Sequence, residues 1–208
     1  HKESGKIFWV FVTHLPTADQ GGQENMAKVV NRFAQQKAGN DPAILIGDMN
    51  ANPSSEAYSI LTQYWNDGCN RNWGTMSGSS ANYSTHYTAA QYSSARPDRR
   101  IDHLMTRGCT AANYRSAIIT YKVGNEDWCP SDHLPVTARV AFIPEVDQSI
   151  YNTPAPANAK TVRIVSSNIR FMNNNQDLEN GWDRRKTAIT SMMKDLKPAV
   201  IGFQECSR

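Results

Sequence analysis

The sequence predicts a single α+β domain, in which short buried strands alternate with amphipathic helices. The chain has 208 residues, of which 39% are hydrophobic, which is enough for one sizeable core. Short apolar, β-branched runs bounded by glycine or proline recur along it, and segments with helical spacing separate them. The net charge of +3 is mildly basic, so an anionic substrate is allowed but not required.

The first part of the chain predicts two strands that alternate with two helices. Residues 6–12 are rich in aromatic and β-branched residues, which is typical of a strand, and they run into His14. Residues 23–38 predict a helix because apolar side chains recur there at helical spacing: Met26, Val29, Val30 and Phe33. Residues 43–46 predict a buried strand, and residues 54–64 predict a helix with a serine cap.

The remainder predicts further strands, a long loop and a linker. Residues 66–98 are polar and aperiodic, and so long a loop indicates a binding surface. Its aromatic residues and His86 would then contact substrate, although packing of the loop on itself is an equal alternative. Residues 144–160 are rich in proline, alanine and asparagine and predict a linker. The last helix is predicted at residues 184–197, and strands are predicted at residues 100–105, 116–123, 136–143, 161–168 and 198–204.

The four cysteines lack the spacing of a zinc site. Cys69, Cys109 and Cys129 lie in loop-like sequence, which favours one disulfide and an oxidising compartment over buried thiols. We therefore expect a secreted or periplasmic protein, with the cytoplasm as the alternative. No apolar run approaches the roughly 18 residues that would cross a bilayer.

Polar residues stand at the ends of most predicted strands. Asp48 and Asn50 would point to the same side if the chain stayed extended after Gly47. Each polar residue alone fits a cap or a hydrogen-bonding role, but so many strand ends together suit a divalent cation with oxygen ligands, beside imidazoles. The set comprises His14, Asp48, Asn50, Asp102, Asp132, His133, Asn168 and Glu205.

These segments resemble the signature motifs of the endonuclease/exonuclease/phosphatase superfamily, which has the DNase I-like fold. The resemblance implies a four-layer α/β/β/α sandwich of two packed mixed β-sheets. The motifs that carry it are Ser167-Asn168-Ile169-Arg170, Phe203-Gln204-Glu205, Thr13-His14-Leu15, Gly47-Asp48-Met49-Asn50, Arg100-Ile101-Asp102-His103 and Ser131-Asp132-His133-Leu134-Pro135-Val136.

The order of these motifs implies a circularly permuted domain that spans residues 1–208. Residues 161–208 resemble the beginning of the family and residues 6–143 resemble its end, with residues 144–160 as the linker between them. Permutation is physically reasonable because the termini of a domain often lie close together. The usual middle section has no counterpart, which leaves a natural rearrangement, a fragment of two tandem domains, or a domain completed by another chain. A segment-exchanged homodimer is one form of the last alternative.

The resemblance further implies a Mg²⁺-dependent phosphoric ester hydrolase that works by in-line attack of an activated water, with Mn²⁺ or Ca²⁺ as alternative cations. It makes Glu205 the main metal ligand, with Asn168 beside it and Asp132 assisting. It also gives catalytic roles to five residues. Asp48 would activate the water, and Asn50 would bind the phosphoryl group. His133 would contact the phosphate or act as acid/base, Asp102 would fix the tautomer of His133, and His14 would be a second imidazole on the phosphate side.

The substrate is less determined by the sequence. Arg170 and Arg185 would add positive potential for substrate binding, and ordinary surface salt bridges are the favoured alternative for both. Because the chain shows no basic stripe, a small-molecule or lipid phosphodiester is favoured over DNA or RNA. A nuclease is one alternative, and a non-catalytic binding module or a fragment completed by a second chain is another.

Overall fold

The computed structural model describes residues 5–69, 100–116, 120–128, 130–142, 161–170 and 181–206. The helices in these ranges are α1 (Gln23–Ala38), α2 (Glu56–Thr62), α4 (Trp182–Leu196) and the short 3-10 helix η1 (Ala18–Gln20). The strands are β1 (Trp9–His14), β2 (Ala43–Asp48), β3 (Asn66–Asp67), β4 (Asp102–Arg107), β5 (Thr110–Ser116), β6 (Tyr121–Val123), β7 (Glu126–Trp128), β8 (Val136–Ala141), β9 (Thr161–Asn168) and β10 (Val200–Gln204).

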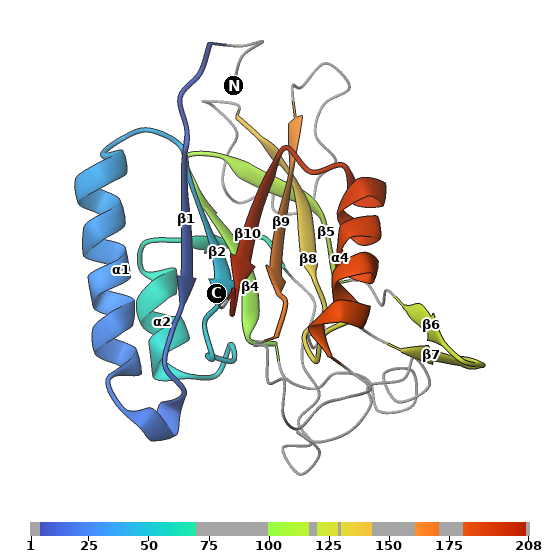
Figure 1. The fold of residues 1–208 in the computed structure, drawn as a ribbon. Helices are drawn as coiled ribbons and strands as arrows, with labels where there is room; N and C mark the ends of the chain where they lie inside the picture. The colour runs from blue at the N-terminus through green and yellow to red at the C-terminus, as the bar shows by residue number, and fades with distance from the viewer. Residues whose placement is uncertain are drawn as a thin grey trace.

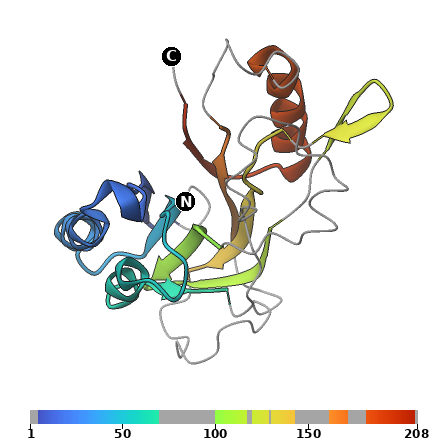
Figure 2. The same ribbon diagram turned by 90° about the horizontal axis from the view of Figure 1, so that it is seen from below.

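Two four-stranded sheets pack face to face, in the strand orders β1-β2-β4-β3 and β10-β9-β8-β5 (Figure 1). Each sheet combines one parallel pair with antiparallel pairs. Helices α1 and α2 cover the outer face of the first sheet, and α4 covers the outer face of the second (Figure 2). The predicted four-layer α+β sandwich is therefore confirmed.

Strand β2 shows how the layers are held together. Its successive side chains alternate between two cores: Ala43 and Leu45 pack under α1 and α2, while Ile44 and Ile46 pack between the two sheets. All of its residues are buried. A strand that is buried on both faces needs the unbroken apolar run that the sequence has here. Burying each large aliphatic side chain stabilises the fold by about 1.5–3 kcal/mol.

Helix α1 has the predicted bounds, but most of its large apolar side chains are exposed. The face that packs on the first sheet is made of Ala27, Ala34 and Ala38, with Val30 partly buried beside them. Met26, Val29 and Phe33 are 42%, 52% and 51% exposed. Small side chains allow the helix to approach the sheet closely, whereas the larger ones would hold it away.

The strands between residues 110 and 128 differ from the sequence prediction. The strand predicted at residues 116–123 is divided, because β5 ends at Ser116, β6 begins at Tyr121, and residues 117–119 lie outside the described ranges. Strand β5 starts at Thr110 in a sequence of weak strand propensity, and its pairing with β8 outweighs that propensity. The predicted linker at residues 144–160 and most of the predicted loop, including His86, also lie outside the described residues.

No disulfide joins Cys69, Cys109 and Cys206 to one another among the described residues. Cys129 lies outside the described ranges, so the expected disulfide stays a prediction where it involves this residue. Burial raises the pKa of the Cys109 thiol to about 12, so this thiol is protonated at neutral pH. Every helix in the described ranges falls short of the length and hydrophobicity needed to cross a bilayer.

Candidate active site

The register of the first sheet places three predicted site residues in one row. His14 of β1 lies opposite Asp48 of β2, and Asp48 lies opposite Asp102 of β4. The strands come very close here, since a Cβ atom on Gly47 would lie 1.8 Å from the carbonyl oxygen of Thr13. Gly47 also has a φ of +148°, which disfavours any other residue. The glycine before Asp48 therefore allows the close approach that aligns the row.

The second sheet brings Asn168 and Glu205 to the same end of the sandwich. Asn168 ends β9, and Glu205 follows β10 with a φ of 59°. The Asn168 side-chain amide donates to Oε1 of Glu205 at 2.9 Å and to Oδ2 of Asp48 at 3.1 Å. One amide thus joins the carboxylates of both sheets. The left-handed backbone at Glu205 costs of order 1 kcal/mol or more, and such strain concentrates at functional sites.

His133 completes the cluster from the segment before β8. Its Nδ1 lies 2.8 Å from Oδ2 of Asp102, and its Nε2 lies 3.7 Å from Oδ2 of Asp48. The Ser131 hydroxyl accepts from the backbone N–H of His133 and donates to the carbonyl of Asn168. With Nδ1 protonated and bound to Asp102, the ring presents Nε2 to the centre of the cluster.

The cluster holds more negative than positive charge. Burial disfavours the charged form of His133, but Asp102 and then Asp132 and Asp48 outweigh burial and raise the pKa of His133 to about 10. Burial, followed by the charge of Asp102, raises the pKa of Asp48 to about 6. A raised pKa of a carboxyl group next to a raised pKa of an imidazole indicates that the site lacks positive charge.

Asn50 reaches the site by a turn, so the extended chain on which the predicted alternation depends is not present here. Its backbone N–H donates to Oδ1 of Asp48 at 2.8 Å, and its φ of 47° lies in the left-handed region. Asparagine adopts both features readily because its short polar side chain tolerates this backbone. The Asn50 amide donates to the carbonyl of Leu15 at 2.8 Å and lies 3.2 Å from Nε2 of His14.

Two overlapping groups of side chains can hold a metal ion among the described residues. One comprises His14, Asp48 and Glu205, and the other comprises Asp48, Asp102 and His133; within each group the ligand atoms lie within 4.8 Å of one another. Carboxylate oxygens dominate both, which fits a hard divalent cation. In this arrangement Asn168 points its Nδ2 at the carboxylates, so ligation by its Oδ1 requires rotation of the amide.

The other predicted residues lie around this centre. Asp132 is buried, its Oδ1 lies 3.4 Å from the Ser131 hydroxyl, and it belongs to neither group of ligand atoms. Arg170 donates its backbone N–H to Oδ1 of Asn168 at 2.9 Å. His86 lies outside the described residues.

Sequence reasoning missed two side chains that hold the site segments together. Gln23 is 3% exposed, and its amide donates to the carbonyls of Pro16 and Asn50. Arg185 is 2% exposed and donates to the carbonyls of Pro130 and Ile169, so its expected surface position is wrong. Both residues lie in the first turns of helices, where polar residues usually face water, and no sequence signal marked them as buried.

A second buried cluster lies on the opposite face of β4. The Arg100 guanidinium binds Oδ2 of Asp67 at 2.5 Å, and the Tyr58 hydroxyl donates to the same oxygen at 2.8 Å. His103, which is fully buried, lies with Nε2 2.8 Å from the carbonyl of Ala51 and Nδ1 3.3 Å from Arg100. Burial alone would raise the pKa of Asp67, but His103 and Arg100 hold it well below its usual value. This network ties β4 to the segment that follows Asp48.

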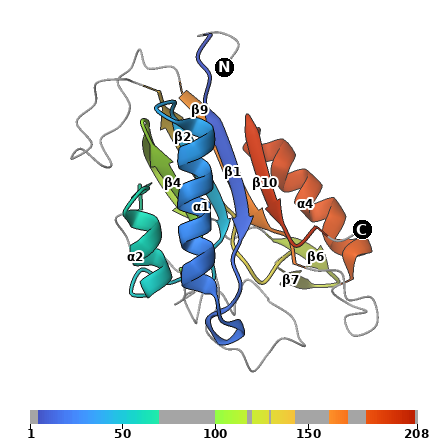
Figure 3. The same ribbon diagram turned by 90° about the vertical axis from the view of Figure 1, so that its left-hand side faces the viewer.

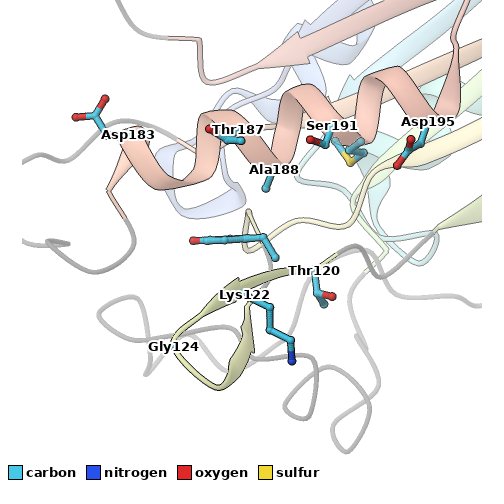
Figure 4. Close-up of a pocket in the computed structure, with 10 residues that line it drawn as sticks. Thr120, Lys122, Gly124, Asp183, Thr187, Ala188, Ser191 and Asp195 are labelled. Carbon is cyan, nitrogen blue, oxygen red and sulfur yellow. The ribbon is translucent and has the colours of Figure 1, made fainter.

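A separate cavity of about 660 Å³ lies between α4 and the β6–β7 hairpin (Figure 4). Its lining includes Thr187, Ala188 and Ser191 from α4 and Lys122 and Gly124 from the hairpin. None of the clustered strand-end residues lines this cavity. The chemistry predicted from the sequence therefore belongs to the end of the sandwich and not to this hollow.

Comparisons with known proteins identify the family and the fold of the chain. Residues 5–133 match the sequence model of the Endonuclease/Exonuclease/phosphatase family. No curated protein sequence matches the chain. A mannosyl-6-phosphatase from Bacteroides thetaiotaomicron is similar in structure, with a TM-score of 0.53, 24% identity and coverage of 68% of this chain and 54% of its own.

Two further solved structures are more distant. An endonuclease/exonuclease/phosphatase family protein from the same species has a TM-score of 0.48 and 22% identity, covering 63% of this chain and 48% of its own. A Staphylococcus aureus beta toxin with bound magnesium ions has a TM-score of 0.35 and 17% identity, covering 62% of this chain and 51% of its own. The chain thus spans about half the length of the solved structures it matches.

Proposed function

Because the chain belongs to the endonuclease/exonuclease/phosphatase family, we propose that it hydrolyses phosphoric esters with the help of a divalent cation. The observation that carries the proposal is the buried cluster of Asp48, Asp102 and His133, joined through Asn168 to Glu205. Its charge is out of balance, since the pKa of Asp48 is raised to about 6. A cation would restore the balance and leave Asp48 ionised for catalysis.

Mg²⁺ is the proposed cation, with Mn²⁺ and Ca²⁺ as alternatives that share its preference for oxygen ligands. Glu205 would be the main ligand, with Asn168 and Asp132 assisting, and the Asp48 carboxylate lies within 4.8 Å of the Glu205 ligand atom. When bound, the cation supplies positive charge to the oxygens of a phosphoryl group.

The side chains around the cation would carry out the other parts of the reaction. Asp48, which can accept a proton, would orient and deprotonate the attacking water. Asn50, whose amide is held at the end of β1, would donate to the phosphoryl oxygens as their charge increases. His133 would bind the phosphate through Nε2 and transfer a proton there, while Asp102 fixes the ring through Nδ1. His14, at 39% side-chain exposure, would be the imidazole nearest to entering substrate.

The substrate class that we propose is a small-molecule or lipid-head-group phosphodiester, bound with the help of Arg170 and His86. The mild net charge of +3 supports this class over duplex nucleic acid, for which several phosphate contacts would be needed. We also propose that the chain is circularly permuted. The central place of β9 in the second sheet, between β10 and β8, supports a single domain built from both parts of the chain.

Hydrolysis of bis-p-nitrophenyl phosphate, with and without Mg²⁺, tests the proposal. The wild type should turn over only with the cation, and Glu205→Ala should lose this turnover while keeping its circular dichroism spectrum. Ser59→Lys, an exposed change on α2, is the matched control and should keep full activity. p-Nitrophenyl phosphate serves as the monoester comparison. If the wild type hydrolyses neither compound in a cation-dependent way, the proposed enzymatic activity is refuted and a binding module is favoured.

A further inference from the structure

The exposed large hydrophobic residues of the described ranges belong to α1, β1, β10 and the segment just before β1. Figure 3 views the side of the sandwich where α1, β1, β10 and α4 lie next to one another. The exposed residues are Ile7, Trp9, Val12, Met26, Val29, Phe33, Ile201 and Phe203. Soluble monomers rarely concentrate apolar surface in this way, and a large contiguous patch marks an interaction surface. We call this surface the apolar edge.

The apolar edge also carries the open strands of both sheets. β1 is the last strand of the first sheet, and β10 is the last strand of the second. The two strands meet across the sandwich, because a Cβ atom on Gly202 of β10 would lie 3.0 Å from Cγ2 of Val12 of β1. Two rows of backbone N–H and C=O groups therefore lie side by side with no strand beyond them among the described residues.

Neither strand carries the features that protect an open edge. Natural edges are usually interrupted by lysine, by proline, by a bulge or by inward-pointing charge. β1 and β10 contain no lysine, arginine, aspartate, glutamate or proline, and their pairing with β2 and β9 is regular throughout. Such edges accept a further strand readily, with main-chain hydrogen bonds for affinity.

A partner must offer two strand edges at once, about 10 Å apart, because that is the spacing of packed sheets. A single extended peptide would complete only one sheet. A second copy of this chain presents the same pair of edges, and their lack of charge means that pairing brings no like charges together.

We propose that two copies of the chain associate through their apolar edges about a two-fold axis. β1 and β10 both end at the site, and Figure 3 shows their arrows pointing to the same end. A two-fold axis perpendicular to the sheets therefore pairs β1 with its copy and β10 with its copy, both antiparallel, and extends each sheet across the dimer. It also brings the Met26, Val29 and Phe33 stripe of α1 against the same stripe of the second copy.

Light scattering and sedimentation of the full chain test the proposal without any substrate, so its outcome is independent of the proposed hydrolysis. We expect twice the chain mass of 23.2 kDa. Val12→Lys and Ile201→Lys should each raise the dimer dissociation constant by more than about tenfold, because each places two lysines in the symmetric interface. Ser59→Lys adds the same charge on α2, away from the apolar edge, and should leave the constant unchanged.

Hydrogen exchange of the wild type gives a second test that needs no variant. Amides of β1 and β10 should gain protection as protein concentration rises, while amides of β3 and β5, at the other ends of the two sheets, should not. A monomer at every concentration would overturn the proposal. A dimer that survives Val12→Lys and Ile201→Lys would also overturn it and would indicate segment exchange instead. A dimer that Ser59→Lys disrupts as strongly as these variants would overturn it too.

Discussion

Asp102 and His103 are neighbours on β4, yet their side chains enter two buried clusters with opposite charge balance. On one face, His103 and Arg100 outweigh the effect of burial and hold the pKa of the Asp67 carboxyl well below its usual value. On the other, Asp102 and Asp48 lie around His133, and burial followed by the charge of Asp102 raises the pKa of Asp48 to about 6. The same residue types thus serve stability where their charge is matched, and leave a place for a cation where it is not.

The largest effect expected from this difference concerns activity. Asp48→Asn should lower cation-dependent hydrolysis by about 10²- to 10⁴-fold, because the group that accepts the proton of the water is lost. The free energy of unfolding should change by less than about 1 kcal/mol, since the change also removes repulsion from Asp102. Steady-state kinetics and urea unfolding measure the two quantities. Retained activity with a large loss of stability would reverse the roles assigned to the two clusters.

The next effect concerns the orientation of His133. Asp102→Asn should reduce kcat by about 10²-fold or more, with a smaller effect on KM, because the ring loses the partner of its Nδ1. It should also lower the pKa of His133, which NMR titration of the imidazole in the presence of a chelator measures. Asp67→Asn should leave this pKa unchanged, and a fall in both variants would count against a specific Asp102 effect.

We call the cluster of Asp67, Arg100 and His103 the matched cluster, and the cluster of Asp48, Asp102 and His133 the unmatched cluster. A change in the matched cluster should lower the free energy of unfolding. Asp67→Asn leaves the buried Arg100 guanidinium without its counter-charge, and the free energy of unfolding should fall by about 3–5 kcal/mol. Urea unfolding at pH 7 measures the loss. Asp19→Asn, on exposed η1, is the control and should behave as wild type. An equal stability of Asp67→Asn and wild type would mean that the ion pair contributes nothing.

The pH dependence of this stability follows from the sign of the shift. The pKa of Asp67 is lower in the folded protein than the value of about 3.9 expected when unfolded. Its contribution is therefore complete above the unfolded value and is lost as pH falls below it. The difference in unfolding free energy between wild type and Asp67→Asn should shrink between about pH 5 and pH 2. A difference that stays constant over this range would exclude linkage to Asp67.

The smallest effect concerns the helix next to the matched cluster. The Ser55 hydroxyl caps α2 by accepting from the backbone N–H of Tyr58 at 3.2 Å. Ser55→Ala should cost about 1 kcal/mol of stability and leave kcat unchanged. Thermal unfolding and kinetics of the variant measure both, and a fall in kcat would mean that the matched cluster also serves the reaction.

Much of the fold was predictable because its signals are local. The bounds of α1 and the buried strand at Ala43 follow from apolar spacing and from breakers such as Gly39 and Pro42. Which face of α1 is buried depends on the partner layer, so Met26 and its neighbours were not identifiable as exposed. Strand β5 depends on its pairing with β8 in the same way.

The site residues that could be predicted from the sequence are those that lie at the ends of strands. Register across β1, β2 and β4 explains why His14, Asp48 and Asp102 converge. The contributions of Gln23 and Arg185 were not predictable, because each acts on carbonyl groups distant in sequence. The turn at Asn50 has a local cause, the hydrogen bond to Asp48, which could have been considered from the Asp-x-Asn spacing.

The central claim is that the unmatched cluster binds a divalent cation, and the dependence of the thermal midpoint on Mg²⁺ tests it most directly. A cation at 100 times its Kd should stabilise the wild type by about 2.7 kcal/mol. Glu205→Gln should lose this stabilisation, while Asp67→Asn, although less stable, should keep all of it. No rise of the midpoint in the wild type, or an equal rise in Glu205→Gln, would contradict the claim.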